Sequence, residues 1–171
     1  GPMKTLVALL LALTLSACDY TTSLTPEPKV DLDPAWLGVW ETSPEVGAPD
    51  RLLLLPLGPR EYLLSYPAGN PDAMFARVCR TGPGENDLMQ ITWVGTAKGK
   101  VPEDGRVYQY AAATLKDGAL TVRLINGEAV GREANNAGEL STAFAAAKDK
   151  PELYREAMVF RKVSGQVEPD E

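Results

Sequence analysis

Residues 106–125, RVYQYAAATLKDGALTVRLI, contain the strongest fold signal in the chain. Asp117-Gly118 lies between two stretches with strand-like composition, 106–115 and 119–125. An Asp-Gly pair is preferred in two-residue hairpin turns, because such turns need a positive φ that these residues tolerate. In the second stretch every other residue is apolar: Leu120, Val122 and Leu124. This spacing is typical of a strand with one buried face, so the segment predicts an antiparallel β-hairpin.

Further short segments on both sides of this hairpin also have the composition of strands, with turn residues between them. They are residues 38–42, 51–57, 61–66, 74–80, 88–94 and 158–163. Gly58-Pro59 supplies a turn between the second and third of these segments. Consecutive short strands joined in this way predict an antiparallel sheet.

Residues 136–147 change to helical spacing. Asn136 followed by Glu139 resembles a helix start, in which a side chain caps the first turn. The apolar residues that follow are spaced as one helical stripe: Leu140, Ala143, Phe144 and Ala147. Pro151 ends the pattern. We therefore predict one late helix before the final strand.

These elements predict an all-β fold with one late α-helix. About eight strands is the number at which an antiparallel sheet closes into a small barrel and removes its exposed edges. We therefore expect an antiparallel, eight-stranded barrel. A β-sandwich of the same strands is the competing architecture, because periodicity does not separate the two.

Three features of this pattern are similar to the lipocalin (calycin) family: Gly38-x-Trp40 in the first strand, the late helix, and Phe160-Arg161 in the last strand. The resemblance implies that Trp40 closes one end of the barrel and that Arg161 packs over it. Such a cation–π pair contributes about 1 kcal/mol or more when it is desolvated. The alternative is that Trp40 is an ordinary core tryptophan.

The beginning of the chain has the features of a targeting segment. Lys4 precedes an apolar run, residues 6–13, that is too short to span a bilayer. Leu15-Ser16-Ala17-Cys18 then resembles the bacterial lipobox. The resemblance implies cleavage before Cys18, a diacylglyceryl group on its thiol and a fatty acid such as palmitate on its amine. The alternative is an ordinary signal peptide with an incidental cysteine.

Asp19 directly after the cysteine resembles the signal that retains lipoproteins in the inner membrane, so we expect that membrane rather than the outer one, facing the periplasm. Residues 19–34 are rich in Thr, Ser and Pro, which favours a flexible tether, or a partner-binding arm. The expected division is 1–2, a remnant of expression; 3–17, the signal peptide; 18–34, the lipidated tether; 35–165, the β-barrel domain; and 166–171, a polar tail.

Composition excludes several functions. The chain has no histidine, which removes the commonest general base and metal ligand. Its net charge of −6 argues against nucleic acid and against electrostatic docking on anionic lipid. Cys79 lies near Arg77 and Arg80, which could activate a thiol, although a buried structural cysteine is commoner. We expect no enzyme activity, no metal and no cofactor.

Aromatic and basic side chains in the middle strands could line a cavity: Trp93, Tyr108, Tyr110 and Arg123. They are equally typical of a packed β core. Ala111-Ala112-Ala113 leaves room for a ligand or for a closely packed helix, and we favour the helix. The expected function is a non-catalytic envelope lipoprotein that binds a small apolar molecule or a partner protein. The alternative is a structural subunit of an envelope or secretion complex.

Overall fold

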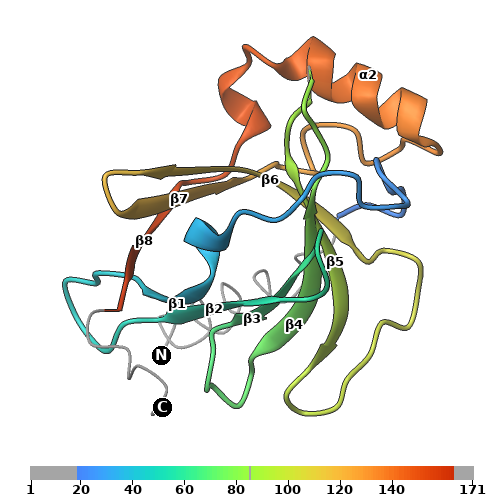
Figure 1. The fold of residues 1–171 in the computed structure, drawn as a ribbon. Coiled ribbons are helices and arrows are strands. Elements are labelled where there is room, and N and C mark those ends of the chain that lie inside the picture. Colours follow the sequence, from blue (N-terminus) through green and yellow to red (C-terminus); the bar gives the residue numbers. More distant parts are fainter. Residues whose placement is uncertain (1–18, 85, 164–171) are drawn as a thin grey trace, which may run out of the picture.

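The chain forms a closed antiparallel β-barrel (Figure 1), as predicted, rather than a sandwich. The computed structural model describes residues 19–84 and 86–163. Its strands follow one another around the barrel in sequence order: β1 Gly38–Glu41, β2 Arg51–Pro56, β3 Tyr62–Tyr66, β4 Met74–Arg80, β5 Met89–Thr96, β6 Tyr108–Lys116, β7 Ala119–Leu124 and β8 Met158–Lys162. Pairing of β1 with β8 closes the barrel. Among the described residues, three helical segments accompany it: η1 Pro34–Trp36, α2 Ala137–Ala147 and η2 Pro151–Leu153.

The predicted hairpin is present between β6 and β7. Asp117 and Gly118 have φ values of 53° and 75°, the left-handed conformations that its tight turn requires. Lys116 pairs with Ala119 on either side of the turn. The local signal in the sequence therefore fixes the register of these two strands.

Apolar side chains form two clusters, one inside the barrel and one outside it. The inner cluster contains buried side chains from the strands: Trp40, Leu52, Leu54, Tyr62, Val78, Leu120 and Phe160. The outer cluster lies between the barrel wall and α2: Tyr20, Leu88, Tyr110, Ile125, Val130, Leu140, Phe144, Ala147 and Leu153. Strand residues alternate between the two sides, so one sheet supplies both clusters.

The late helix α2 packs on the outside of the barrel, at the top of Figure 1. Its Asn136 cap accepts a hydrogen bond from the backbone N–H of Glu139 (2.9 Å), as the sequence predicts. Leu140, Phe144 and Ala147 are its buried residues and form the predicted apolar stripe. Within residues 19–84 and 86–163, no helix has the length and hydrophobicity needed to cross a bilayer.

The beginning of the described chain is packed against the barrel, which corrects the expected flexible tether. Tyr20 is only 1% exposed and forms a β-bridge with Tyr108. Asp19, Thr22 and Thr25 are buried as well. The expectation of a tether relied on composition, but the polar groups of this segment find hydrogen-bond partners on the barrel. We call residues 19–25 the N-terminal strap.

Candidate functional site

The barrel interior is the first place to look for a ligand, and it is almost filled. The cavity that remains has a volume of about 50 Å³ and is lined by Trp36, Leu52, Leu54, Tyr62, Leu64, Val78, Met89, Ile91, Ala111, Ala113, Leu120 and Val122. Sites for small organic ligands are typically about 300–1,000 Å³. The interior is therefore a packed apolar core with a small void.

The segment before β1 covers one opening of this void. The Asp33 amide donates to the Tyr62 hydroxyl (2.7 Å), and the Leu32 amide donates to the Pro59 carbonyl (3.0 Å). These bonds hold η1 against the β2–β3 hairpin, with Trp36 in the lining of the void. A larger ligand would have to displace this segment.

A buried polar atom lies on the same side of the sheet as the void. Gln109 is 4% exposed and pairs in register with Ile91, which lines the void. Its Nε2 donates to the Ile125 carbonyl (2.9 Å), but among the described residues its Oε1 has no hydrogen-bond partner. Such an atom can accept a hydrogen bond from a water molecule or a ligand.

Trp40 is 1% exposed, and the cation over its ring is Lys162 rather than Arg161. The Lys162 Nζ lies 5.4 Å from the ring centroid. Trp40 and Lys162 pair directly, so their side chains share one face of the sheet. Arg161 pairs with Glu41 on the other face. Because Phe160 points into the barrel, the next residue must point out.

The side chains predicted to line a cavity are not among those lining the void. Ala111 and Ala113 face the interior, so alternation directs Tyr110 to the outer cluster. Tyr108 packs against the same outer cluster. The Trp93 indole N–H donates to the Gly95 carbonyl (3.0 Å). The predicted preference for a helix over a ligand beside the alanine run is consistent with Ala112, which packs against the outer cluster.

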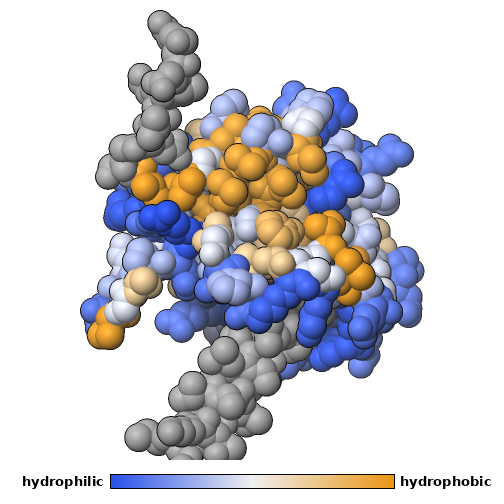
Figure 2. Space-filling model, turned by 90° about the horizontal axis from the view of Figure 1, so that it is seen from below, coloured by the Kyte–Doolittle hydropathy of each residue, from blue (hydrophilic) through white to orange (hydrophobic). Residues whose placement is uncertain are grey.

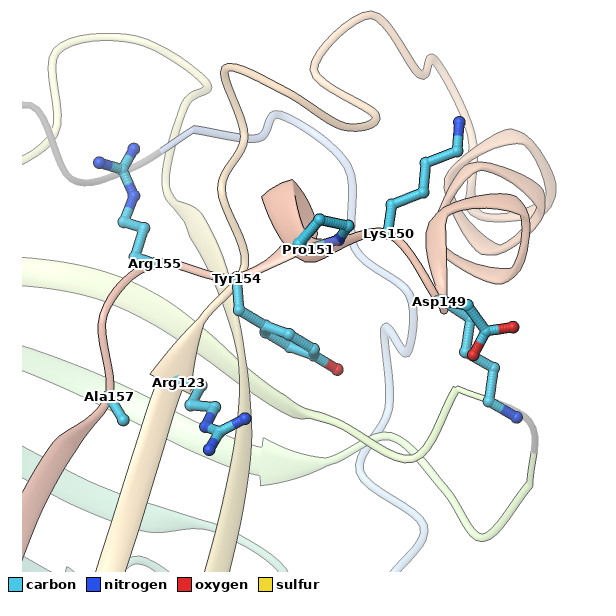
Figure 3. Close-up of a pocket in the computed structure, with 8 residues that line it drawn as sticks. Arg123, Asp149, Lys150, Pro151, Tyr154, Arg155 and Ala157 are labelled. Carbon is cyan, nitrogen blue, oxygen red and sulfur yellow. The ribbon is translucent and has the colours of Figure 1, made fainter.

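Arg123 lies in a cleft on the outer surface of the protein (Figure 3). The cleft has a volume of about 410 Å³ and is lined by Arg123, Lys148, Asp149, Lys150, Pro151, Tyr154, Arg155 and Ala157. Residues of β7 thus meet the chain that leaves α2 and passes through η2. The outward direction of Arg123 follows from the inward direction of Leu120 and Val122.

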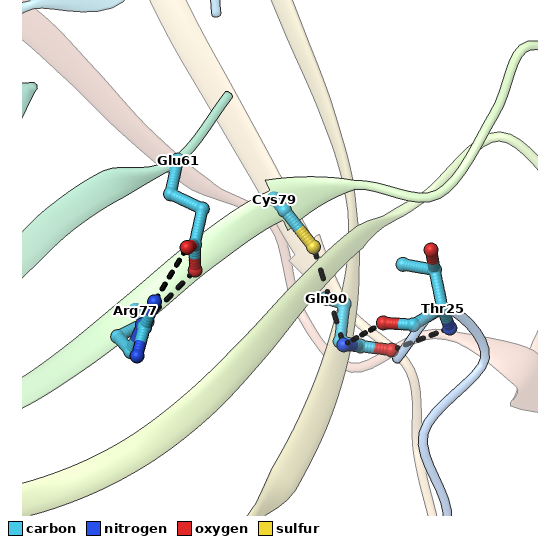
Figure 4. A network of polar contacts seen from close by, with 5 residues as sticks. All are labelled: Thr25, Glu61, Arg77, Cys79 and Gln90. Atoms are coloured by element: carbon cyan, nitrogen blue, oxygen red, sulfur yellow. Dashed lines mark hydrogen bonds and ion pairs between the residues drawn. The ribbon is translucent and has the colours of Figure 1, made fainter. Parts of the chain in front are cut away.

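Gln90 forms a buried polar centre that the sequence analysis did not identify (Figure 4). Its Oε1 accepts hydrogen bonds from the backbone amides of Leu24 (2.9 Å) and Thr25 (3.1 Å), and its Nε2 donates to the Thr25 carbonyl (3.0 Å). The Tyr110 hydroxyl donates to the Thr22 carbonyl (2.6 Å) beside it. These bonds fasten the strap to β5 and β6. The only signal for this centre in the sequence was the polar side chain of Gln90 within the mostly apolar strand segment 88–94.

Aromatic rings complete this attachment. Tyr20, Tyr110 and Phe144 contact one another edge to face, with centroids 5.4–5.7 Å apart. The Tyr20 hydroxyl donates to the Val130 carbonyl (2.7 Å). Burial raises the pKa of both Tyr20 and Tyr110, so these hydroxyls act as neutral donors. The cluster therefore joins the strap, the barrel and α2.

Asp19 is the first residue of the strap. It follows Cys18, which lies outside the described residues. Its carboxylate faces Arg155, with Oδ2 3.5 Å from the guanidinium Nη2. Its side chain also fills the space above Gly127, where a Cβ would collide with it. The packing gives Asp19 a structural role, and its predicted effect on membrane sorting stays a prediction.

Cys79 is buried, and its surroundings do not activate it. Burial raises the pKa of its thiol to about 11, and the negative charge of Glu61 adds to this effect. Arg77 points to Glu61 instead (Figure 4), with Nε–Oε2 at 3.0 Å. Arg80 is paired with Asp87. The thiol therefore stays protonated at neutral pH, which is typical of a structural cysteine.

Within the part of the chain that the structure describes, no group of three or more acidic or cysteine side chains is placed to hold a metal ion. Comparison with known proteins gave no match to any family, to any curated protein or to any solved structure.

Proposed function

We propose that the chain is a bacterial envelope lipoprotein, anchored by lipid on Cys18, whose barrel binds a partner protein without catalysis. The observation that carries the choice of partner is the interior void of about 50 Å³, which is too small for an organic ligand as the barrel stands. A binding role then has to use the outer surface.

The outer face of β1–β3 supports this reading. Leu52 and Leu54 point inward, so Leu53 and Leu55 point outward, and Leu55 is 42% exposed. Leu55 pairs with Leu63, and Leu53 pairs with Val39, which adds apolar side chains to the same face. Seen from below, the molecule presents a broad hydrophobic area (Figure 2). Apolar areas of this kind are common at protein interfaces.

The proposal also includes a lipocalin-like relationship. The arrangement that supports it is a buried tryptophan in the first strand, a late helix, and a cation of the last strand over the tryptophan ring. The cation is Lys162, whereas the family resemblance implies the preceding residue, Arg161.

A photo-crosslinking amino acid at Leu55, in the bacterium that produces the protein, tests the partner. We expect one discrete higher-mass adduct. The same probe at Thr114, an exposed outward position on β6, is the control and should give none. Equal adducts from both positions, or none from Leu55, would contradict the proposal. Fatty-acid labelling that persists in a Cys18→Ser protein would contradict the anchor.

A small apolar ligand is the second candidate, because the void has an apolar lining and Gln109 Oε1 is unpartnered nearby among the described residues. Native mass spectrometry of protein purified from its own host distinguishes the two. A retained ligand would favour this candidate, and its absence together with the Leu55 adduct would favour the partner protein.

A further inference from the structure

The cleft around Arg123 is a concentration of positive charge on an acidic protein. Four of its lining side chains are cationic, Arg123, Lys148, Lys150 and Arg155, and one is acidic, Asp149 (Figure 3). Glu152 and Glu156 are neighbours in sequence but are not among the residues that line the cleft. The local charge therefore differs in sign from the net charge of −6.

Most of these cations are available to a ligand. Among the described residues, Arg123, Lys148 and Lys150 form no ion pair, and all three are exposed. Arg155 makes one contact with Asp19, at 3.5 Å. In Figure 3 the Arg123 guanidinium lies on the same side of the chain as the Tyr154 ring, while Lys150 points away from it. Arginine and lysine around a hydroxyl-bearing ring suit a phosphate group.

The position of the cleft relative to the anchor is the second observation. Arg155 lines the cleft and contacts Asp19, and Asp19 directly follows Cys18 in the chain. The Asp19 side chain is only 5% exposed, and Tyr20 is 1% exposed. Within the described chain, packing against the barrel therefore starts at Asp19, the residue that follows the cysteine. A lipid on that cysteine would bring this side of the barrel to the head groups.

We propose that the cleft binds the phosphate group of an anionic membrane lipid and so orients the barrel on the bilayer. The inference rests on the lipid anchor of the proposed function. The acidic side chains elsewhere on the protein do not prevent such binding, because charges more than about 8–10 Å apart are screened at physiological salt. The cleft can therefore attract an anionic lipid even though the net charge of −6 predicts repulsion between the whole protein and anionic lipid.

Vesicle co-sedimentation of the chain from residue 18 onward, carrying Cys18→Ser, tests the proposal. This chain contains every strand and helix described above, and circular dichroism would check that it is folded. It cannot be lipidated, so the result does not depend on whether Cys18 carries lipid. We expect binding to vesicles that contain phosphatidylglycerol but not to phosphatidylcholine alone, with weaker binding as salt is raised.

The double variant Arg123→Glu with Lys150→Glu should weaken this binding by roughly tenfold or more, because each cation near the membrane surface contributes. The matched control, Lys100→Glu with Lys116→Glu, makes the same change of net charge away from the cleft and should retain binding. An equal loss in both variants, or no preference for phosphatidylglycerol, would overturn the proposal. If inorganic phosphate shifts the NMR signals of residues 148–155 while the vesicles bind nothing, the ligand is a soluble anion and the assignment to lipid is wrong.

Discussion

At the scale of single residues, the alternation of strand side chains decides which groups meet. Lys162 rather than Arg161 covers Trp40, because only the former shares a face with it. The same rule sends Arg123 to the surface cleft and Tyr110 to the outer cluster. Residue type suggested these side chains as functional, but their direction determines what each one can bind.

Gly127 is the residue at which a minimal change should release the strap. In Gly127→Ala, the new Cβ would collide with the Asp19 side chain, so either the strap or the loop must move. We expect the free energy of unfolding to fall by about 1–3 kcal/mol, as for other overpacked sites. Urea denaturation measures this.

Gly105→Ala is the matched control, because its Cβ would meet only Thr21 Cγ2, at 4.0 Å. This variant should retain the stability of the parent protein. If both variants unfold at the same urea concentration as the parent, the packing of Asp19 over Gly127 is not as described.

At the scale of elements, one amide side chain, Gln90, makes three of the hydrogen bonds that hold the C-terminal end of the strap. Replacing Gln90 with leucine keeps the size of the side chain but removes the acceptor of the buried Thr25 amide. It also removes one of the two acceptors of the Leu24 amide, which keeps only the Tyr110 hydroxyl. Each unsatisfied buried group costs about 1–3 kcal/mol. We expect thermolysin, which cuts before leucine, to cleave at Leu24 much faster in Gln90→Leu while the barrel stays intact.

Gln109→Leu is the control, because it also replaces a buried glutamine of the barrel with leucine. Gln109 lies one residue before Tyr110 on β6 but makes no hydrogen bond to the strap in the described chain. Cleavage at Leu24 should be unchanged in this variant. Faster cleavage in both variants, or in neither, would contradict the role assigned to Gln90.

Elements with a local signal were predictable, and those that depend on distant contacts were not. Asp117-Gly118 specifies its turn within two residues, and Asn136 caps α2 within one turn. The strap has no such signal, because its partners on the barrel are 65–136 residues away in sequence. Its Thr- and Pro-rich composition therefore resembled that of a free tether. The direction of Trp93 also depends on the irregular register between β4 and β5.

At the scale of the whole molecule, burial of several weak acids makes stability depend on pH. Burial raises the pKa of Cys79 from 9.0 to about 11 and raises the pKa of Tyr20 and Tyr110. Between pH 9.0 and about 11 the unfolded chain has lost the Cys79 proton, while the folded chain keeps it. The stabilisation that this proton provides is complete below pH 9.0 and is lost as the pH rises through this range.

We therefore expect the melting temperature to fall as the pH is raised above about 9, measured by circular dichroism. In Cys79→Ala the fall between pH 9.0 and about 11 should be smaller, because the tyrosines alone contribute. A melting temperature that is constant or rises over this range would show that these groups titrate alike in the folded and unfolded chains.

The strap, which starts at Asp19 directly after Cys18, is part of the folded domain rather than a free tether. Hydrogen exchange of the lipidated protein tests it most directly, because the Tyr20 amide is bonded to the Tyr108 carbonyl (3.1 Å) and the Leu24 amide to Gln90. We predict that both amides exchange as slowly as those at the centres of β5 and β6. Exchange of these amides at the rate of an unstructured peptide would contradict the claim.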